Sequence, residues 1–265
     1  MATLAESSCA TDSAVTTTRI DVEVRNGRHQ VRTVAGQLRA MRLHSPADRA
    51  RVALVGQTAL LLGGDEVDLE ITVGPGASLE LSDIAGTVAY HGRGRPAAWH
   101  VRIRLGDGAR LRYAGEPFVV SDGADVTRTL TVDLADGASA RLRETVVFGR
   151  VGEIGGRLAT TTVLRRSGVE FCREELLLDP IGRSRPGVLR DVRVVDSVLA
   201  LGGTTLLRAN SEQQREGGLA PRTGPNGCQT SFSIGSDVAT YRLLDEGSTL
   251  TRFLGSSLAD SPLSA

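Results

Sequence analysis

The sequence predicts an all-β fold, mainly strands with a few helices, in which the strands stack in layers to form a β-helix-like or solenoid body. Three similar stretches indicate this: VGPGASLEL from residue 73, LGDGARLRY from residue 105 and LADGASARL from residue 134. In each, apolar and polar residues alternate around a short turn that contains Gly-Ala, and alternation with a period of two is typical of strands. Glycine suits such turns because it adopts positive φ without steric cost.

The turn glycines recur at a nearly constant interval. Gly76, Gly108, Gly137 and Gly168, the last from a fainter fourth copy, follow one another at 32, 29 and 31 residues. A strand-turn-strand unit of roughly 30 residues that recurs is typical of stacked β-layers, such as a β-helix or a long sandwich. A run of unrelated hairpins with similar turns is the alternative. All of these arrangements place strands in the middle of the chain.

The individual strands are expected where the alternation is clearest. Residues 68–73, 100–105 and 129–134 each lead into one of the three turns. Around residues 45–48 a short helical turn and a continuing strand are equally compatible with the sequence.

After Asp179-Pro180 the pattern loosens into a mixed C-terminal third. We predict strands at residues 228–235 and 238–244, and the composition also fits helices at 206–215 and 248–254.

The chain is organised as one domain behind a tail. Residues 1–18 lack the basic start and apolar stretch of a secretory signal and are predicted to be disordered. Residues 19–265 contain no Pro/Ser-rich linker, so we expect a single domain. The most apolar run, at 52–62, is too short to span a bilayer. Together with three widely spaced cysteines, these features predict a soluble, cytoplasmic protein.

Composition and motifs exclude several classes of function. Lys+Arg and Asp+Glu both total 31, and this balance argues against binding to nucleic acid or to an anionic membrane. Every Lys+Arg residue is arginine, so neither a Schiff-base lysine nor a P-loop lysine is present. The chain also lacks the G-x-S-x-G, H-E-x-x-H and Cys-x-x-Cys motifs. We therefore expect no enzymatic activity and no tightly bound cofactor.

Three carboxylates stand out by their position. Asp65 follows a glycine pair, while Glu144 and Glu174 lie in predicted strands. Solvated strand carboxylates are the simplest interpretation. Buried carboxylates would need partners, and paired carboxylates on a β-helix would also suit a polysaccharide-cleaving enzyme, which stays as an alternative. The candidate partners nearby in the sequence are Arg143, Arg150 and Arg173.

The ordered motifs between Val52 and Asp179 carry a family resemblance. LLLGGDEVDLEITVGPGASLELSDIAGTVAYHG, then GARLRYAGEPFVVSDGADVTRTLTVDLADGASARLRETVVFGRVGE, then VEFCREELLLD follow one another in this order. This series resembles the UreD (UreH) family of urease accessory proteins. The chain departs from the usual family pattern at the following residues: Asp83-Ile84 in place of Thr-Gln, Val88 and His91 in place of basic residues, and Gly115-Glu116 in place of Pro-Gln.

The resemblance implies a non-enzymatic maturation factor with a layered, β-helix-like fold. Such proteins bind the structural subunits of apo-urease and join an F-type accessory protein, which recruits a G-type GTPase, and together they deliver nickel. The resemblance also implies that Asp65, Glu144 and Glu174 lie along an internal polar route for the metal. Nickel would be in transit there rather than tightly bound, and carboxylates and water are among the ligands available to it.

Overall fold

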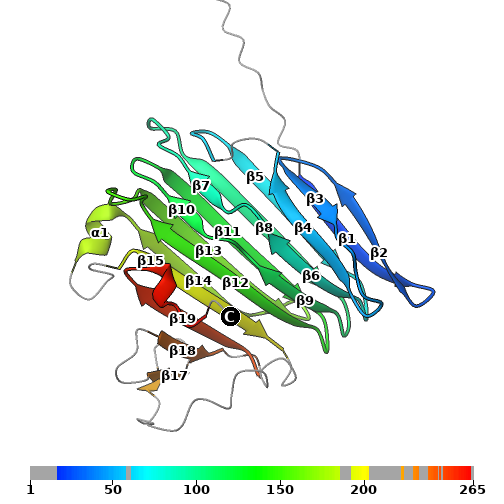
Figure 1. The fold of residues 1–265 in the computed structure, drawn as a ribbon. Coiled ribbons are helices and arrows are strands. Elements are labelled where there is room, and N and C mark those ends of the chain that lie inside the picture. The colour runs from blue at the N-terminus through cyan, green and yellow to red at the C-terminus, as the bar shows by residue number, and fades with distance from the viewer. Residues whose placement is uncertain are drawn as a thin grey trace, which may run out of the picture.

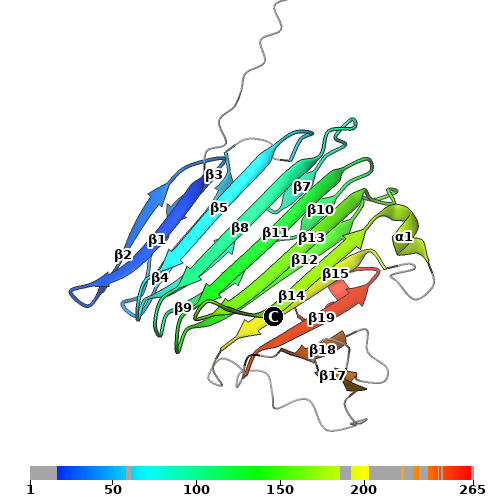
Figure 2. The ribbon, with the colours of Figure 1, turned by 180° about the vertical axis from the view of Figure 1, so that it is seen from behind.

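The computed structural model describes residues 17–57, 61–185, 192–202, 222–223, 229–232, 238–243, 245 and 247–263. Strands dominate these residues and form two large sheets that lie one against the other (Figures 1 and 2). The chain passes back and forth between the sheets in a solenoid of about four turns, as the sequence predicts.

The first sheet, sheet A, is seven-stranded. Its strands in spatial order are β14 (Val169–Leu178), β13 (Arg157–Arg166), β11 (Asp125–Leu134), β8 (Ala97–Leu105), β5 (Glu66–Val73), β1 (Thr18–Arg25) and β2 (Arg28–Val34). The five strands from β13 to β1 are parallel, and an antiparallel strand closes each edge.

The second sheet, sheet B, contains the returning strand of each turn of the solenoid. In spatial order it holds β16 (Arg222–Thr223), β17 (Gln229–Phe232), β18 (Val238–Arg242), β19 (Thr249–Gly255), β15 (Val194–Leu201), β12 (Ser139–Phe148), β9 (Arg110–Ala114), β6 (Ser78–Asp83), β4 (Ala50–Gly56) and β3 (Leu38–Arg42). Two short strands lie off this path: β7 (Thr87–Ala89) and β10 (Phe118–Val120).

The core consists of columns of apolar side chains between the sheets. Parallel pairing in register places equivalent residues of successive turns side by side, so one inward position becomes a continuous column. Burying each such side chain contributes roughly 1.5–3 kcal/mol. The central column of sheet A is at most 1% exposed and consists of Ile20, Ile71, Ile103, Val132 and Leu164.

The repeated Gly-Ala turns are the corners at which the chain leaves sheet A for sheet B. Gly76, Gly108 and Gly137 have φ values of +65°, +62° and +67°, which confirms the need for glycine. The fourth copy differs, because the turn at Gly168 joins β13 to β14 in an antiparallel hairpin within sheet A. The repeat therefore ends there, and β14 closes the edge of the sheet.

Two helices considered from the sequence are not formed. Residues 45–48 form an irregular connection with a turn at 47–48, and 248–254 belongs largely to β19. β19 pairs along its length with β15, so tertiary pairing outweighs any helical preference of its sequence.

The strands predicted near 228–235 and 238–244 are present as β17 and β18. Residues 206–215, Cys9, Cys228 and most of the predicted tail lie outside the described residues. One short helix not predicted, α1 (Pro180–Ser184), begins where the Asp179 side chain accepts hydrogen bonds from the backbone N–H groups of Ile181 and Gly182. None of the helices in the described ranges has the length and apolar character needed to cross a bilayer.

Sheet B is interrupted in two successive turns of the solenoid. β6 ends at Asp83 before β7 begins, and β9 ends at Ala114 before β10 begins. The neighbouring β12 is continuous and pairs with both β9 and β10. Residues 84–86 and 115–117 thus interrupt the regular ladder on one side of β12, and this is where the candidate site lies.

A buried carboxylate fastens the end of the described chain to sheet B. Asp196 is fully buried and accepts hydrogen bonds from Arg143 (3.1 and 2.8 Å), from Thr145 Oγ1 (2.9 Å) and from Ser261 Oγ (2.6 Å). Ser261 directly follows the 3₁₀ helix η1 (Leu258–Asp260). Burial acts to raise the pKa of Asp196, but these hydrogen bonds and the charge of Arg143 outweigh burial and lower it.

We predict that Gly76→Val destabilises the protein by about 1–3 kcal/mol, because a β-branched residue is strained at positive φ. In the part of the chain that the structure describes, no other residue lies within 4 Å of an added Cβ there, so the expected strain is conformational. Asparagine tolerates this conformation, and Gly76→Asn is the matched control. Urea unfolding of both variants measures the difference. Equal losses for the two substitutions would show that side-chain size, not φ, is decisive.

Removing the Asp196 carboxylate should cost about 3 kcal/mol, because it leaves Arg143 without its partner. Ser261→Ala removes one hydrogen bond to the same carboxylate and should cost about 1.5 kcal/mol. Because the folded-state pKa of Asp196 is lowered, its contribution is present above the ordinary pKa and lost as the pH falls through the folded value. Unfolding free energies of Asp196→Ala and Ser261→Ala near pH 7 test this ranking, which a larger loss for the serine variant would contradict.

Candidate functional site

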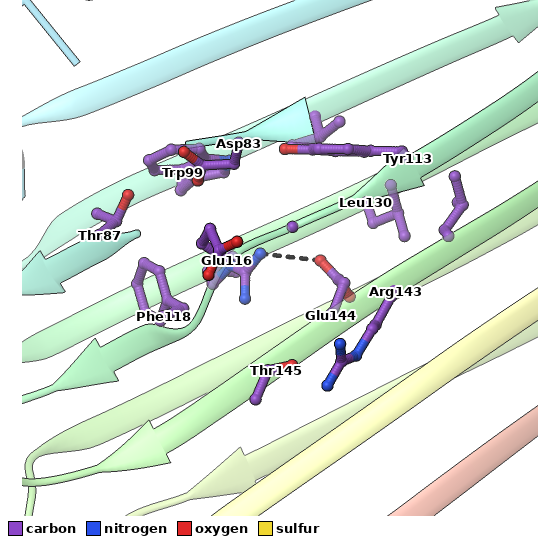
Figure 3. Close-up of a pocket in the computed structure, with 14 residues that line it drawn as sticks. Asp83, Thr87, Trp99, Tyr113, Glu116, Phe118, Leu130, Arg143, Glu144 and Thr145 are labelled. Carbon is purple, nitrogen blue, oxygen red and sulfur yellow. Dashed lines mark hydrogen bonds and ion pairs between the residues drawn. The ribbon is translucent and has the colours of Figure 1, made fainter. Parts of the chain in front are cut away.

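Three cavities in series lie between the sheets, since residues from both sheets line them. The largest, of about 270 Å³, lies at the interruption of sheet B. It meets a narrow cavity of about 30 Å³ (Figure 3), which leads to a third of about 60 Å³. The first two share Asp83, Thr87, Trp99 and Tyr113, and the last two share Arg128, Leu130 and Glu144.

An ion pair between the two sheets occupies the narrow cavity. Arg128 of β11 donates to Glu144 of β12 at 2.8 Å, and its guanidinium lies 4.5 Å from the centre of the Phe118 ring. The side chain of Arg128 is 14% exposed, and its buried Nε has no hydrogen-bond partner among the described residues. A cavity of about 30 Å³ has room for about two water molecules. The ion pair therefore lies at the neck of the series.

A second pair connects the sheets in the third cavity. Arg252 of β19 donates to both oxygens of Glu174 of β14, each at 2.8 Å, and its Nε donates to Ser197 Oγ at 3.0 Å. Burial acts to lower the pKa of Arg252, but the hydrogen bonds and charge of Glu174 outweigh burial, so the pKa is raised and the guanidinium stays charged. Two opposite charges are thus held between the sheets, in a cavity that hydroxyl and apolar side chains also line.

Among the described residues, no arginine lies within ion-pair distance of two carboxylates nearer the largest cavity, Asp83 and Glu116. Asp83 accepts a hydrogen bond from the backbone N–H of Ala85 at 3.2 Å, and Glu116 lies in the 115–117 interruption. Burial raises the pKa of Asp83 above its ordinary value; the bond from Ala85 opposes this, while the negative charge of Glu116 adds to it. Holding Asp83 ionised at this position therefore costs free energy.

The structure brings two of the three sequence-predicted residues to the cavities. Glu144 and Glu174 line them, and both line the third cavity. Asp65 lies in the turn before β5, where its Oδ2 accepts a hydrogen bond from the backbone N–H of Leu62 at 2.9 Å. It is not among the residues that line the three cavities.

The three arginines that the sequence offered as candidate partners do not bind these carboxylates. Each binds another carboxylate: Arg143 binds Asp196, Arg150 binds Glu153 and Arg173 binds Glu170. Successive residues of a strand point to opposite faces, so Arg143 points away from the face that Glu144 occupies. The arginines that bind Glu144 and Glu174 are Arg128 and Arg252, and each comes from the opposite sheet.

Sequence reasoning also missed several residues of the site. Asp83 and Glu116 were noted only as departures from a family pattern. Asp83 ends an alternating strand, which was an available signal, whereas Glu116 lies between two strands and offered none. No sequence pattern marked out Arg128, Arg252 or Trp99 as site residues. Their contacts depend on how the two sheets pack against each other, which the local sequence does not reveal. Within the described part of the chain, no group of three or more His, Cys, Asp or Glu side chains is arranged to hold a metal ion.

Comparison with known proteins establishes the family. The family described as UreD urease accessory protein matches residues 15–260, a range that includes every residue lining the cavities. The chain belongs to the UreD family. It is 49% identical over 180 residues to urease accessory protein UreD 1 of Streptomyces griseus, covering 67% of this chain and 71% of the relative.

Other UreD relatives match over longer stretches. Urease accessory protein UreD 1 of Saccharopolyspora erythraea is 38% identical over 201 residues, which cover 72% of this chain and 74% of the relative. Urease accessory protein UreD of Streptomyces coelicolor is 33% identical over 218 residues, which cover 80% of this chain and 85% of the relative. These matches confirm the UreD resemblance inferred from the ordered motifs.

The raised pKa of Asp83 predicts a stability penalty at neutral pH. The ionised carboxylate opposes folding above its folded-state pKa, and this penalty disappears below the ordinary value of 3.8. Asp83→Asn keeps an oxygen for the Ala85 N–H group and removes the charge, so it should raise the melting temperature near neutral pH. The gain should shrink as the pH falls. Thermal unfolding from about pH 8 to about pH 4 measures this, and a variant less stable than the parent throughout would contradict it.

Proposed function

We propose that this UreD-family protein is a non-enzymatic scaffold of urease maturation. It binds the structural subunits of apo-urease in the cytoplasm and joins an F-type accessory protein, through which a G-type GTPase is recruited. Together these proteins assist insertion of nickel into the urease active site. Membership of the family and the names of its relatives as urease accessory proteins support this proposal.

The observation that carries the nickel role is the series of cavities that crosses the interior beside four carboxylates. Isolated charges are strongly disfavoured between apolar sheets, and replacing a buried ion pair with apolar residues is often neutral or stabilising. Folding alone therefore gives little reason for Arg128–Glu144 and Arg252–Glu174. A route for a dication would explain why these charged residues are kept, because carboxylates and water are suitable ligands for a metal that is held briefly and released.

In this proposal nickel is cargo, and the arginines balance charge while the route is empty. An arriving dication competes with a guanidinium for each glutamate and takes its place. Asp65, which lies in a turn outside the cavities, is assigned the outer part of the route. The polysaccharide-cleaving alternative has no structural support, because Glu144 and Glu174 are each engaged by an arginine instead of being available as acid and base.

Replacing both members of the Arg128–Glu144 pair, called the inner pair below, separates an effect on nickel delivery from an effect on folding. Glu144→Gln alone would leave Arg128 buried without a partner, so we choose the double variant Arg128→Met/Glu144→Leu, with side chains of similar volume. Such exchanges are often neutral or stabilising by about 1–4 kcal/mol. We expect an unchanged or higher melting temperature, normal co-purification with urease and its accessory proteins, and at least tenfold less nickel in co-expressed urease.

The surface pair Arg150–Glu153 provides the matched control. It lies in the turn after β12, outside the cavities, with Arg150 exposed and Glu153 partly buried, and Arg150→Met/Glu153→Leu removes the same charges there. Nickel content measured by mass spectrometry should fall only for the inner pair. Full nickel content with the inner variant would refute the interior route, and loss of co-purification with urease would show that the variant acts through partner binding instead.

A further inference from the structure

Three arginines, called the arginine patch below, lie together on the outer face of sheet B. Arg110 and Arg112 belong to β9, and Arg141 belongs to the neighbouring β12 (Figure 1). Each follows a core residue that is at most 1% exposed, so each points away from the interior. β9 and β12 are parallel, and their register places Arg112 directly opposite Arg141. The fold itself therefore gathers three positive charges on one strip of this face.

The carboxylates of this face are engaged by other arginines. Glu80 of β6 is opposite Arg112 in the register, but its carboxylate lies 3.8 Å from Arg49 and 3.7 Å from Arg51. The buried carboxylate of β15 is bound by Arg143. Among the described residues, no carboxylate lies within ion-pair distance of the arginine patch. The patch thus lacks a counter-charge in this chain.

Holding these charges together costs free energy. Like charges on directly opposed residues of adjacent strands repel and destabilise a sheet. Arg141 is also partly buried, and burial together with the charges of Arg112 and Arg143 lowers the pKa of its guanidinium. The chain as a whole has no net charge, so the patch is a local asymmetry and not one part of a generally basic surface. An anionic group supplied from outside would offset the repulsion.

The geometry of the patch favours several carboxylates on one chain. Residues two apart along a strand are separated by about 6.8 Å, and neighbouring strands by about 4.8 Å. Carboxylates on alternate residues of an extended segment have a matching spacing, and arginine binds a carboxylate through two parallel hydrogen bonds. Sites for small molecules are concave, whereas no residue of the patch lines any of the three cavities. A flat strip of this kind suits an acidic protein segment better than a small anion such as phosphate.

We propose that the arginine patch docks an acidic segment of a partner protein, whose carboxylates bind Arg110, Arg112 and Arg141. The segment supplies the negative charge that this strip lacks and relieves the repulsion between Arg112 and Arg141. Charge complementarity of this kind accelerates association and selects among partners. The inference rests on the proposed function only for the identity of the partner as a urease structural subunit or the F-type accessory protein, because the patch is defined by this chain alone.

A fluorescein-labelled peptide of alternating glutamate and serine is a direct probe of the patch. Fluorescence anisotropy with the purified full-length protein should show saturable binding that weakens as NaCl is added, because exposed charges are screened by salt. Arg112→Gln/Arg141→Gln should weaken this binding about tenfold or more. The same variant should keep or raise the melting temperature, since it removes a repulsion. Arg112→Gln alone, at an exposed position, provides a second variant.

Arg32→Gln/Arg104→Gln is the matched control, because it removes two exposed arginines from the outer face of sheet A. Its affinity for the glutamate peptide should equal that of the parent, and a peptide of alternating glutamine and serine should not bind. No saturable binding by the parent, or unchanged affinity in Arg112→Gln/Arg141→Gln, would overturn the patch. Inorganic phosphate that binds as tightly as the glutamate peptide would overturn the acidic segment in favour of a small anion.

Failure of the patch and failure of the proposed function give different results. Co-purification with the urease structural subunits and the F-type accessory protein is compared for the parent and for Arg112→Gln/Arg141→Gln. If the parent binds the glutamate peptide through the patch but co-purifies with neither partner, the patch stands and the scaffold is refuted. If the parent and the variant co-purify equally well with both partners, the scaffold stands and docking at the patch is refuted.

Discussion

The structure depends on the in-register parallel stacking of successive turns of the chain. This register turns each inward position into a column between the sheets, so a single polar substitution interrupts a column that is otherwise apolar. The column Val67, Trp99, Arg128, Thr160 and Leu176 runs across sheet A, and Glu144, Ser197 and Arg252 are aligned across sheet B. Glu174 lies in the next inward column of sheet A, opposite Thr162. Charges placed in these columns meet across the interior, which produces the pairs Arg128–Glu144 and Arg252–Glu174.

The apolar columns and the polar ones have different roles. The column that contains Ile71 and Ile103 is fully buried and belongs to a continuous apolar core that holds the turns of the solenoid together. The polar columns add little to stability, since a buried ion pair seldom gains more than it loses by desolvation. Asp83 is a separate case: it lies outside these columns, and burial raises its pKa, so keeping its charge costs free energy. Residues kept at such a cost are typical of functional positions.

The sequence predicts the architecture well because its signals are local. A turn such as the one at Gly76 needs positive φ, and alternation on both sides of it requires strands, so the three corners could be located from residues alone. The interior could be predicted only in part. Glu144 and Glu174 were identified through a resemblance, but their partners Arg128 and Arg252 are 16 and 78 residues away and belong to the opposite sheet. Sequence proximity favoured Arg143, which points to the other face of its own strand.

The central claim is that the metal is handled between the sheets and not on the outer surface. X-ray diffraction from crystals of the protein exposed to NiCl₂, recorded at the nickel absorption edge, locates the ion directly by its anomalous scattering. The account predicts a peak between the two sheets, beside Glu144 or Glu174. Peaks confined to the outer surface, for example at the exposed His44, with nothing between the sheets, would contradict it.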